Sequence, residues 1–159
     1  MMTWDMFRRH LREKYRPVHD AETGMILCWE LPSGTQLLEV TLRSETFRGP
    51  SVDVSARVGD SKTIKPVDAL TYNRGSLLGA LVLIGDVYLL RQVLALKEAT
   101  SEATSEMTSE ETSEETSEEI DDAFVYLAGE ALRLRLHTAA APGSPATPWS
   151  AWTEPNTVK

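Results

Sequence analysis

The sequence lacks most of the features that announce a catalytic chemistry. It has one cysteine among 159 residues, so no disulfide can form within the chain. Its three histidines, His10, His19 and His137, are far apart and do not have the spacing of metal ligands. Neither a nucleophile elbow nor a glycine-rich phosphate loop is present. We therefore expect a protein that is not an enzyme and that uses no metal and no cofactor.

A concentrated basic face is also missing. The net charge is -8, and 11 of the 24 acidic residues lie between residues 98 and 122, a range without Lys or Arg. The remainder has 16 basic against 13 acidic residues and is close to neutral. Nucleic-acid binding requires clustered basic residues, and the arginines near the N-terminus are more typical of a solvated helix face. We expect no nucleic acid among the partners.

Long hydrophobic runs are absent as well. The longest is interrupted at Gly85-Asp86, and the chain opens with no pattern of a signal peptide. The single cysteine, Cys28, stands in the apolar run MILCWEL and is expected to be a buried, unreactive thiol, which suits a reducing compartment. A cytoplasmic protein without membrane association is the simplest expectation.

The apolar residues that are present recur with clear periods. Trp4, Phe7, Leu11 and Tyr15 predict an amphipathic helix, with Thr3 as its cap and Pro17 just beyond its end. The run MILCWEL and two alternating runs over residues 38–42 and 52–58 predict three strands. Because the alternating runs each have one polar face, we expect an antiparallel meander.

A hairpin is predicted after a short helix or turn that ends at Gly75. Gly85 at the first central position suits a two-residue type II′ turn. Both faces of this hairpin are apolar. One face pairs Ile84 with Val87, Val82 with Leu89 and Leu78 with Val93, and the other pairs Leu83 with Tyr88, Leu81 with Leu90 and Leu77 with Leu94.

The last helix is expected to begin near Ser117, because Thr116 and Glu119 have the spacing of a capping box. One apolar stripe runs through Ile120, Phe124, Leu127, Ala131 and Leu134. A second stripe, formed by Val125, Ala128, Leu132 and Leu136, exceeds what one sheet face requires. This second stripe is the predicted dimer interface.

The segment TSEATSEMTSEETSEETSEE, from Thr100 to Glu119, repeats a four-residue unit. We expect one domain from residues 1–99 and 117–137, with 100–116 as a disordered acidic insertion and 138–159 as a disordered proline-rich tail. A frayed extension of the last helix and a phosphorylatable acidic arm remain alternatives for the repeat. Trp149 and Trp152 leave open whether the tail docks on the domain.

Taken together, the expected fold is α+β: a helix, a three-strand antiparallel meander, a short helical link, a two-strand hairpin and a long C-terminal helix. With Asn73, the strand that contains Gly79, the turn Gly85-Asp86, and the runs VYLLRQVL and IDDAFVYLAGEALRL, it resembles the type III secretion chaperone-like fold. That fold is shared by the small effector chaperones and the YbjN-like family. The resemblance covers residues 1–137 in layout and is most specific from about residue 73 to 136.

The resemblance implies a homodimer that binds an extended segment of another protein and catalyses nothing. The predicted partner-binding residues are Leu81, Leu83, Tyr88 and Leu90, on one face of the hairpin. The competing interpretation is that this face is core beneath the last helix and that the outer face consists of Val82, Ile84, Val87 and Leu89. The alternative function is a YbjN-like regulatory or structural interaction protein without a secreted client.

Overall fold

The alternating runs form a single antiparallel sheet with helices on one face. The structure, a computed structural model, describes residues 2–44, 46–97 and 109–139, and in the last helix it describes the side chains of residues 117–138. The described strands are β1 (His19–Ala21), β2 (Gly24–Leu31), β3 (Gly34–Arg43), β4 (Ser51–Asp60), β5 (Ala80–Ile84) and β6 (Val87–Ala95). They lie side by side in the order β1-β2-β3-β4-β6-β5. The predicted α+β class is confirmed.

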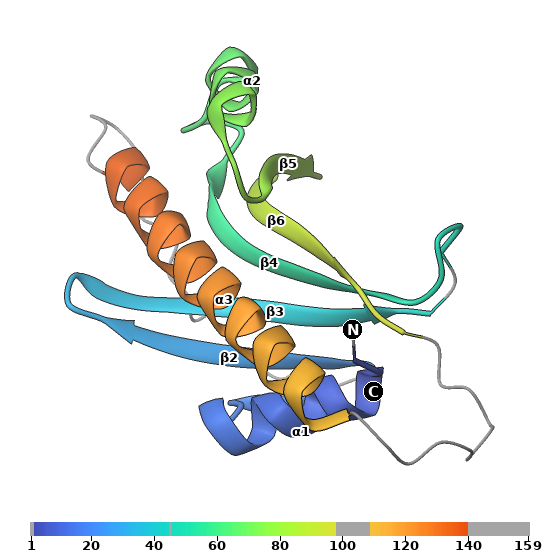
Figure 1. Ribbon diagram of the computed structural model, residues 1–159. Coiled ribbons are helices and arrows are strands. Elements are labelled where there is room, and N and C mark those ends of the chain that lie inside the picture. Colours follow the sequence, from blue (N-terminus) through green and yellow to red (C-terminus); the bar gives the residue numbers. More distant parts are fainter. Residues whose placement is uncertain (1, 45, 98–108, 140–159) are drawn as a thin grey trace, which may run out of the picture.

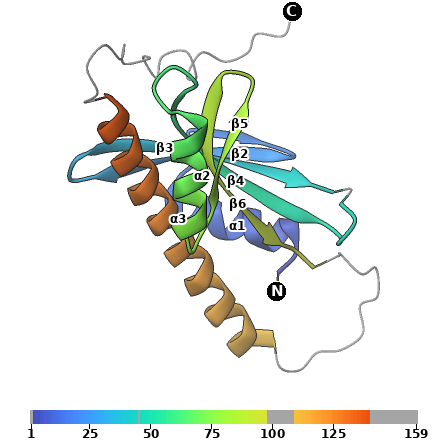
Figure 2. The same cartoon turned by 90° about the horizontal axis from the view of Figure 1, so that it is seen from above.

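Three helices are described: α1 (Trp4–Tyr15), α2 (Pro66–Gly75) and α3 (Ser109–Ala139). Helix α3 runs obliquely across one face of the sheet, and α1 lies near its N-terminal end (Figures 1 and 2). As predicted, the Thr3 side chain caps α1 by accepting a hydrogen bond from the Met6 N–H. Over the described residues, none of these helices is both long enough and apolar enough to cross a bilayer.

The predicted hairpin is confirmed over the length of β5. Its register pairs Ile84 with Val87 and Leu81 with Leu90. Gly85 has a φ of 59°, the left-handed value that the first central residue of a type II′ turn requires. Strand β5 begins only at Ala80, so the pairs predicted for Leu77 and Leu78 are wrong. The reason is that the chain leaves α2 through Gly79, whose φ of 74° interrupts an extended strand.

Three further local features differ from the expectation. The segment His19–Ala21, for which no strand is predicted, forms the short edge strand β1. Helix α3 begins at Ser109 and not near Ser117, because an existing helix propagates into Glu-rich sequence without a new nucleation cost. Thr116 is therefore inside the helix and does not cap it. The rest of the predicted insertion, residues 100–108, lies outside the described residues. Of the predicted tail, residues 138 and 139 belong to α3, and residues 140–159, with Trp149 and Trp152, lie outside the described residues.

Cys28 is exposed, which corrects its predicted burial. Strand β2 alternates so that Met25, Leu27 and Trp29 face the helices, and this places Cys28 on the opposite face of the sheet. Trp29 determines this choice, since its ring packs against Tyr15 at 4.5 Å between centroids and against Phe124 at 6.0 Å. An aromatic cluster therefore decides which side of β2 is buried.

The core lies between the sheet and the two helices α1 and α3. Phe7 and Leu11 of α1 are completely buried, and so are Leu127, Ala128 and Ala131 of α3. From the sheet, the buried residues include Leu27, Leu38, Val40, Val52, Val54 and Leu90. Burying one such side chain contributes about 1.5 to 3 kcal/mol. The predicted stripe that begins at Ile120 and Phe124 is thus confirmed as the face of α3 that packs on the sheet.

A polar contact joins α1 to α3 beside this core. The Asp121 carboxylate accepts hydrogen bonds from Lys14 and from the Tyr15 hydroxyl, and it lies 2.9 Å from the His10 Nε2 atom. Burial acts to raise the pKa of Asp121, but the hydrogen bonds from Lys14, Tyr15 and His10 outweigh it and hold the pKa below its usual range. Burial, followed by the contact with Asp121, raises the pKa of Tyr15. Asp121 therefore anchors the two helices to each other.

Asn73 links α2 to the outer edge of β5. Its Oδ1 atom accepts a hydrogen bond from the Leu81 N–H at 2.7 Å, and its Nδ2 atom donates to the Leu81 carbonyl at 2.9 Å. The side-chain amide thus takes the place of a neighbouring strand at this position. An edge strand with free backbone groups is a site of unwanted pairing, and Asn73 removes one such site.

We predict that Asn73→Ala lowers the free energy of unfolding by about 1 to 3 kcal/mol, because both backbone groups of Leu81 lose their partner. Urea unfolding of the full chain measures this difference. Thr71→Ala is the matched control, since the exposed Thr71 hydroxyl contacts only the Val67 carbonyl within the same helix. Equal stability of the two variants would show that Asn73 does not hold α2 on β5.

Candidate functional site

The predicted partner-binding residues do not form one exposed surface. Leu81, Tyr88 and Leu90 are buried, and only Leu83 is exposed, at 48%. The physical reason is that this hairpin face continues the core face of β4, where Ala56 pairs with Leu90. The prediction of an exposed binding face is therefore wrong for three of the four residues. The competing interpretation agrees with the structure, in which Ile84 is exposed on the opposite face while Val82, Val87 and Leu89 are partly buried.

The predicted dimer stripe is divided in the same way. Ala128 and Leu132 are buried in the core, whereas Val125 and Leu136 are exposed at 51% and 45%. The middle turns of α3 thus bury a wider arc of the helix than the turns on either side. Both apolar stripes are used within one chain at Ala128 and Leu132, so the four residues cannot act together as an interface between two copies.

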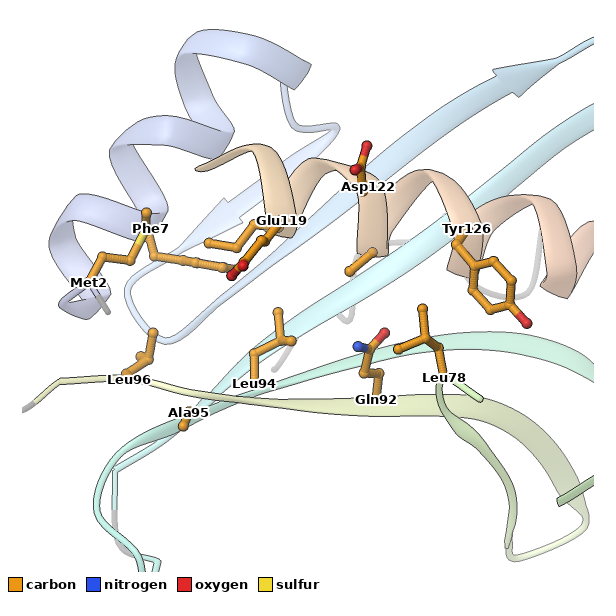
Figure 3. A pocket seen from close by; sticks show the side chains of 12 residues that line it. Met2, Phe7, Leu78, Gln92, Leu94, Ala95, Leu96, Glu119, Asp122 and Tyr126 are labelled. Atoms are coloured by element: carbon orange, nitrogen blue, oxygen red, sulfur yellow. The ribbon is translucent and has the colours of Figure 1, made fainter. Parts of the chain in front are cut away.

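A different feature, an open groove between α3 and the end of β6, is the candidate site (Figure 3). Its volume is about 780 Å³. The sheet wall carries side chains of β6 and the residue that follows it, the helix wall carries side chains of α3, and Met2 and Phe7 close one end. The lining residues are Met2, Phe7, Leu78, Gln92, Leu94, Ala95, Leu96, Glu119, Ile120, Asp122, Ala123 and Tyr126.

Local structure places each wall of the groove. Alternation along β6 turns Gln92 and Leu94 toward α3, and Leu96 continues the same direction. Met2 is positioned by its carbonyl, which accepts a hydrogen bond from the Lys97 N–H at 3.0 Å. Leu78 reaches the groove because it precedes β5 and is not used in strand pairing.

The charge of the groove is confined to one side. Glu119 and Asp122 lie on the α3 wall and are exposed, while none of the described lining residues is basic. Asp121, between them in sequence, points to α1 and is already paired there. The groove therefore combines an apolar interior with two carboxylates at its helix side. Such a lining suits an apolar ligand that also carries positive charge.

Few elements of a reactive centre accompany this groove. Among residues 2–44, 46–97 and 109–139, no three His, Cys, Asp or Glu side chains are close enough together to hold a metal ion. The densest polar cluster in the sequence, His19, Asp20 and Glu22, has a structural use, since Asp20 pairs with Arg8 and Arg12 of α1. The described lining of the groove offers apolar and acidic contacts.

No protein-family model matches the chain, and no curated protein or solved structure matches it either. The site consequently rests on its own geometry. Leu78, Leu94 and Tyr126 were not identified from the sequence, where Leu78 and Leu94 were assigned to hairpin pairs. The signal that points to them is the mismatch between the long apolar run and the five residues of β5.

The different burial of Leu83 and Leu90 leads to a direct test. We predict that Leu90→Ala lowers the free energy of unfolding by about 2 to 5 kcal/mol, because it leaves a cavity in the core. Leu83→Ala, which removes the same atoms from an exposed position on the same hairpin face, is expected to change it by about 0.5 kcal/mol or less. Urea unfolding compares the two variants. If both substitutions changed the free energy of unfolding equally little, this hairpin face would not be part of the core.

Proposed function

We propose that this protein is a protein-binding module of the chaperone or adaptor kind, and that it holds an apolar, positively charged segment of another protein in the groove between α3 and β6. The observation that carries the proposal is the apolar groove itself, open to solvent and bordered by Glu119 and Asp122. The resemblance to type III secretion chaperones supports the same class of function. Catalysis forms no part of the proposal.

The size of the groove suits a peptide segment. About 780 Å³ is within the usual range of ligand pockets, about 300 to 1,000 Å³, and admits several side chains at once. Apolar anchors of a bound segment would contact Leu78, Leu94 and Ile120. A lysine or arginine beside those anchors would meet Glu119 or Asp122, and these charges would select against acidic segments.

The prediction is that short random peptides selected on the immobilised protein are enriched in large apolar residues next to Lys or Arg. Leu78→Glu with Tyr126→Glu should weaken the best selected peptide by about tenfold or more, because it adds charge to the apolar walls. Fluorescence anisotropy of the labelled peptide measures the affinity. Both positions are only partly buried, at 39% exposure, so the fold tolerates the substitutions.

The matched control is Val125→Glu with Leu136→Glu. These residues lie on α3, they are more exposed than the test pair, and they do not line the groove. The control variant should bind the peptide as the parent does. If both double variants lose affinity equally, or if the selected peptides show no apolar and basic enrichment, the groove is not the binding site.

A homodimer remains part of the proposal, but through another surface. Besides Leu78 of the groove, five large apolar side chains are exposed on α2, on β5 or between them: Val67, Leu70, Leu77, Leu83 and Ile84. Exposed apolar surface of this kind is typical of an interaction site. We propose self-association along the edge formed by α2 and β5. The same observation favours the second candidate function, a regulatory or structural interaction protein without a secreted client. For both functions we propose a cytoplasmic location.

We expect the parent to sediment as a dimer at about 10 µM, a concentration at which a dimer with a Kd near 1 µM is largely assembled. Leu70→Glu with Ile84→Glu should give a monomer, because two charges would be buried between the copies. Val125→Glu with Leu136→Glu, on the exposed part of the stripe in α3, should leave the dimer intact. The reverse result would place the interface on α3, and a monomeric parent would exclude both surfaces.

A further inference from the structure

The face of the sheet opposite α3 carries a second pocket, at the end where β3 and β4 are joined. Its volume is about 770 Å³. The loop after β3 forms one side of it and projects from the end of the sheet (Figure 1). Strand β6 forms the other side with Arg91 and Val93, which alternate with Gln92 and Leu94 of the first groove, and with Ala95, which lines both pockets. The two pockets are thus separated by the thickness of one strand.

Three arginines line this pocket, Arg43, Arg48 and Arg91, and none of the described lining residues is acidic; Glu45, in the same loop, lies outside the described residues. One carboxylate, Asp53, lies beneath them and is almost fully buried. Arg91 holds Asp53 with two contacts of 2.6 Å, from Nε to Oδ1 and from Nη2 to Oδ2. Because the Arg91 guanidinium already donates to Asp53, it has few donors left for a ligand. Arg91 and Asp53 therefore form the floor of the site.

The other two arginines retain their donors. Arg43 touches Asp53 only through Nη2 at 3.5 Å, the limit of a hydrogen bond, and its side chain is 57% exposed. Arg48 has no hydrogen bond or ion pair to another described residue. A guanidinium carries five N–H donors in a planar fork that matches a carboxylate. The pocket therefore has two guanidinium groups with donors available to a ligand, those of Arg43 and Arg48, above the ion pair of Arg91 and Asp53.

The loop adds an apolar element to this charge. A turn closed by the Gly49 N–H, which donates to the Thr46 carbonyl at 3.1 Å, presents Phe47 fully to solvent. Val93, on the strand side, is exposed as well. An inorganic anion would make no use of these two side chains. A ligand with carboxylates and carbon atoms, such as an acidic peptide, would contact both the forks and the apolar wall.

From these observations we propose that the pocket binds the carboxylates of an acidic peptide segment, with Arg43 and Arg48 as the binding residues and Phe47 and Val93 as its apolar wall. The chain itself carries carboxylates just beyond the strand that lines the pocket, at Glu98, Glu102 and Glu106, whereas the other acidic residues of the range 98–122 belong to α3. The acidic segment of the same chain and that of another chain are two sources of one chemistry. The experiment distinguishes them.

The probe is a labelled peptide with the sequence TSEETSEETSEE, residues 108–119, titrated with the full chain at low ionic strength and followed by fluorescence anisotropy. A second protein has the glutamates between residues 98 and 115 replaced by glutamine. The seven substitutions also change the net charge from -8 to -1. Tighter binding to this protein than to the parent therefore identifies the segment of the same chain as the occupant only if the gain is lost when Arg43 and Arg48 are replaced as well. Equal binding identifies a segment from another chain. Either result supports the site.

Arg43→Gln with Arg48→Gln, made in the glutamine-substituted protein, should weaken the peptide by about tenfold or more. The control is Arg9→Gln with Arg74→Gln in the same protein, which removes equal charge from exposed positions of α1 and α2. An equal loss of affinity in the control would show that the effect comes from net charge alone, and it would overturn the proposal. Absence of binding to either protein would overturn it too. The proposal would also be overturned if a single-stranded oligonucleotide of matched charge bound more tightly than the peptide and if that binding depended on Arg43 and Arg48.

Discussion

The packing of α3 across the sheet is the constraint on which the rest of this structure depends. The sheet presents one face of Leu, Val and Met side chains, and α3 covers it with Phe124, Leu127 and Leu132. Ala128 and Ala131 are completely buried at the same contact, where their small size lets the helix backbone come close to the strands. Larger side chains at these two positions would lift the helix and open the core along its whole length.

The oblique path of α3 also creates the candidate site. Because the helix crosses the sheet at an angle, it covers the middle strands and leaves the end of β6 partly uncovered near Leu94 and Leu96 (Figures 1 and 3). Helix α1 supports this end, since Asp121 and the aromatic contacts of Phe124 attach it to α3. The groove is therefore a consequence of how the core is closed.

Strand β6 has two roles that follow from the alternation of its side chains. Gln92 and Leu94 face the apolar groove with its acidic side, whereas Arg91 and Val93 face the arginine pocket on the other side. The two sites have opposite charge and are separated by one layer of backbone. Apart from Ala95, which lines both, substitutions in one site can therefore be made without altering the lining of the other, so the two proposals can be tested separately.

The sequence by itself determined the elements whose signals are local. The period of Phe7 and Leu11 and the cap at Thr3 specify α1, and the turn at Gly85 specifies the hairpin and its register. Only the tertiary structure decided that β6 pairs with β4, that Leu90 is core while Ile84 is exposed, and that Cys28 faces outward. The physical reason is that both faces of this hairpin are apolar, so local sequence does not distinguish them. The choice is made by the surface that α3 covers, and it leaves the groove with no signature in the sequence.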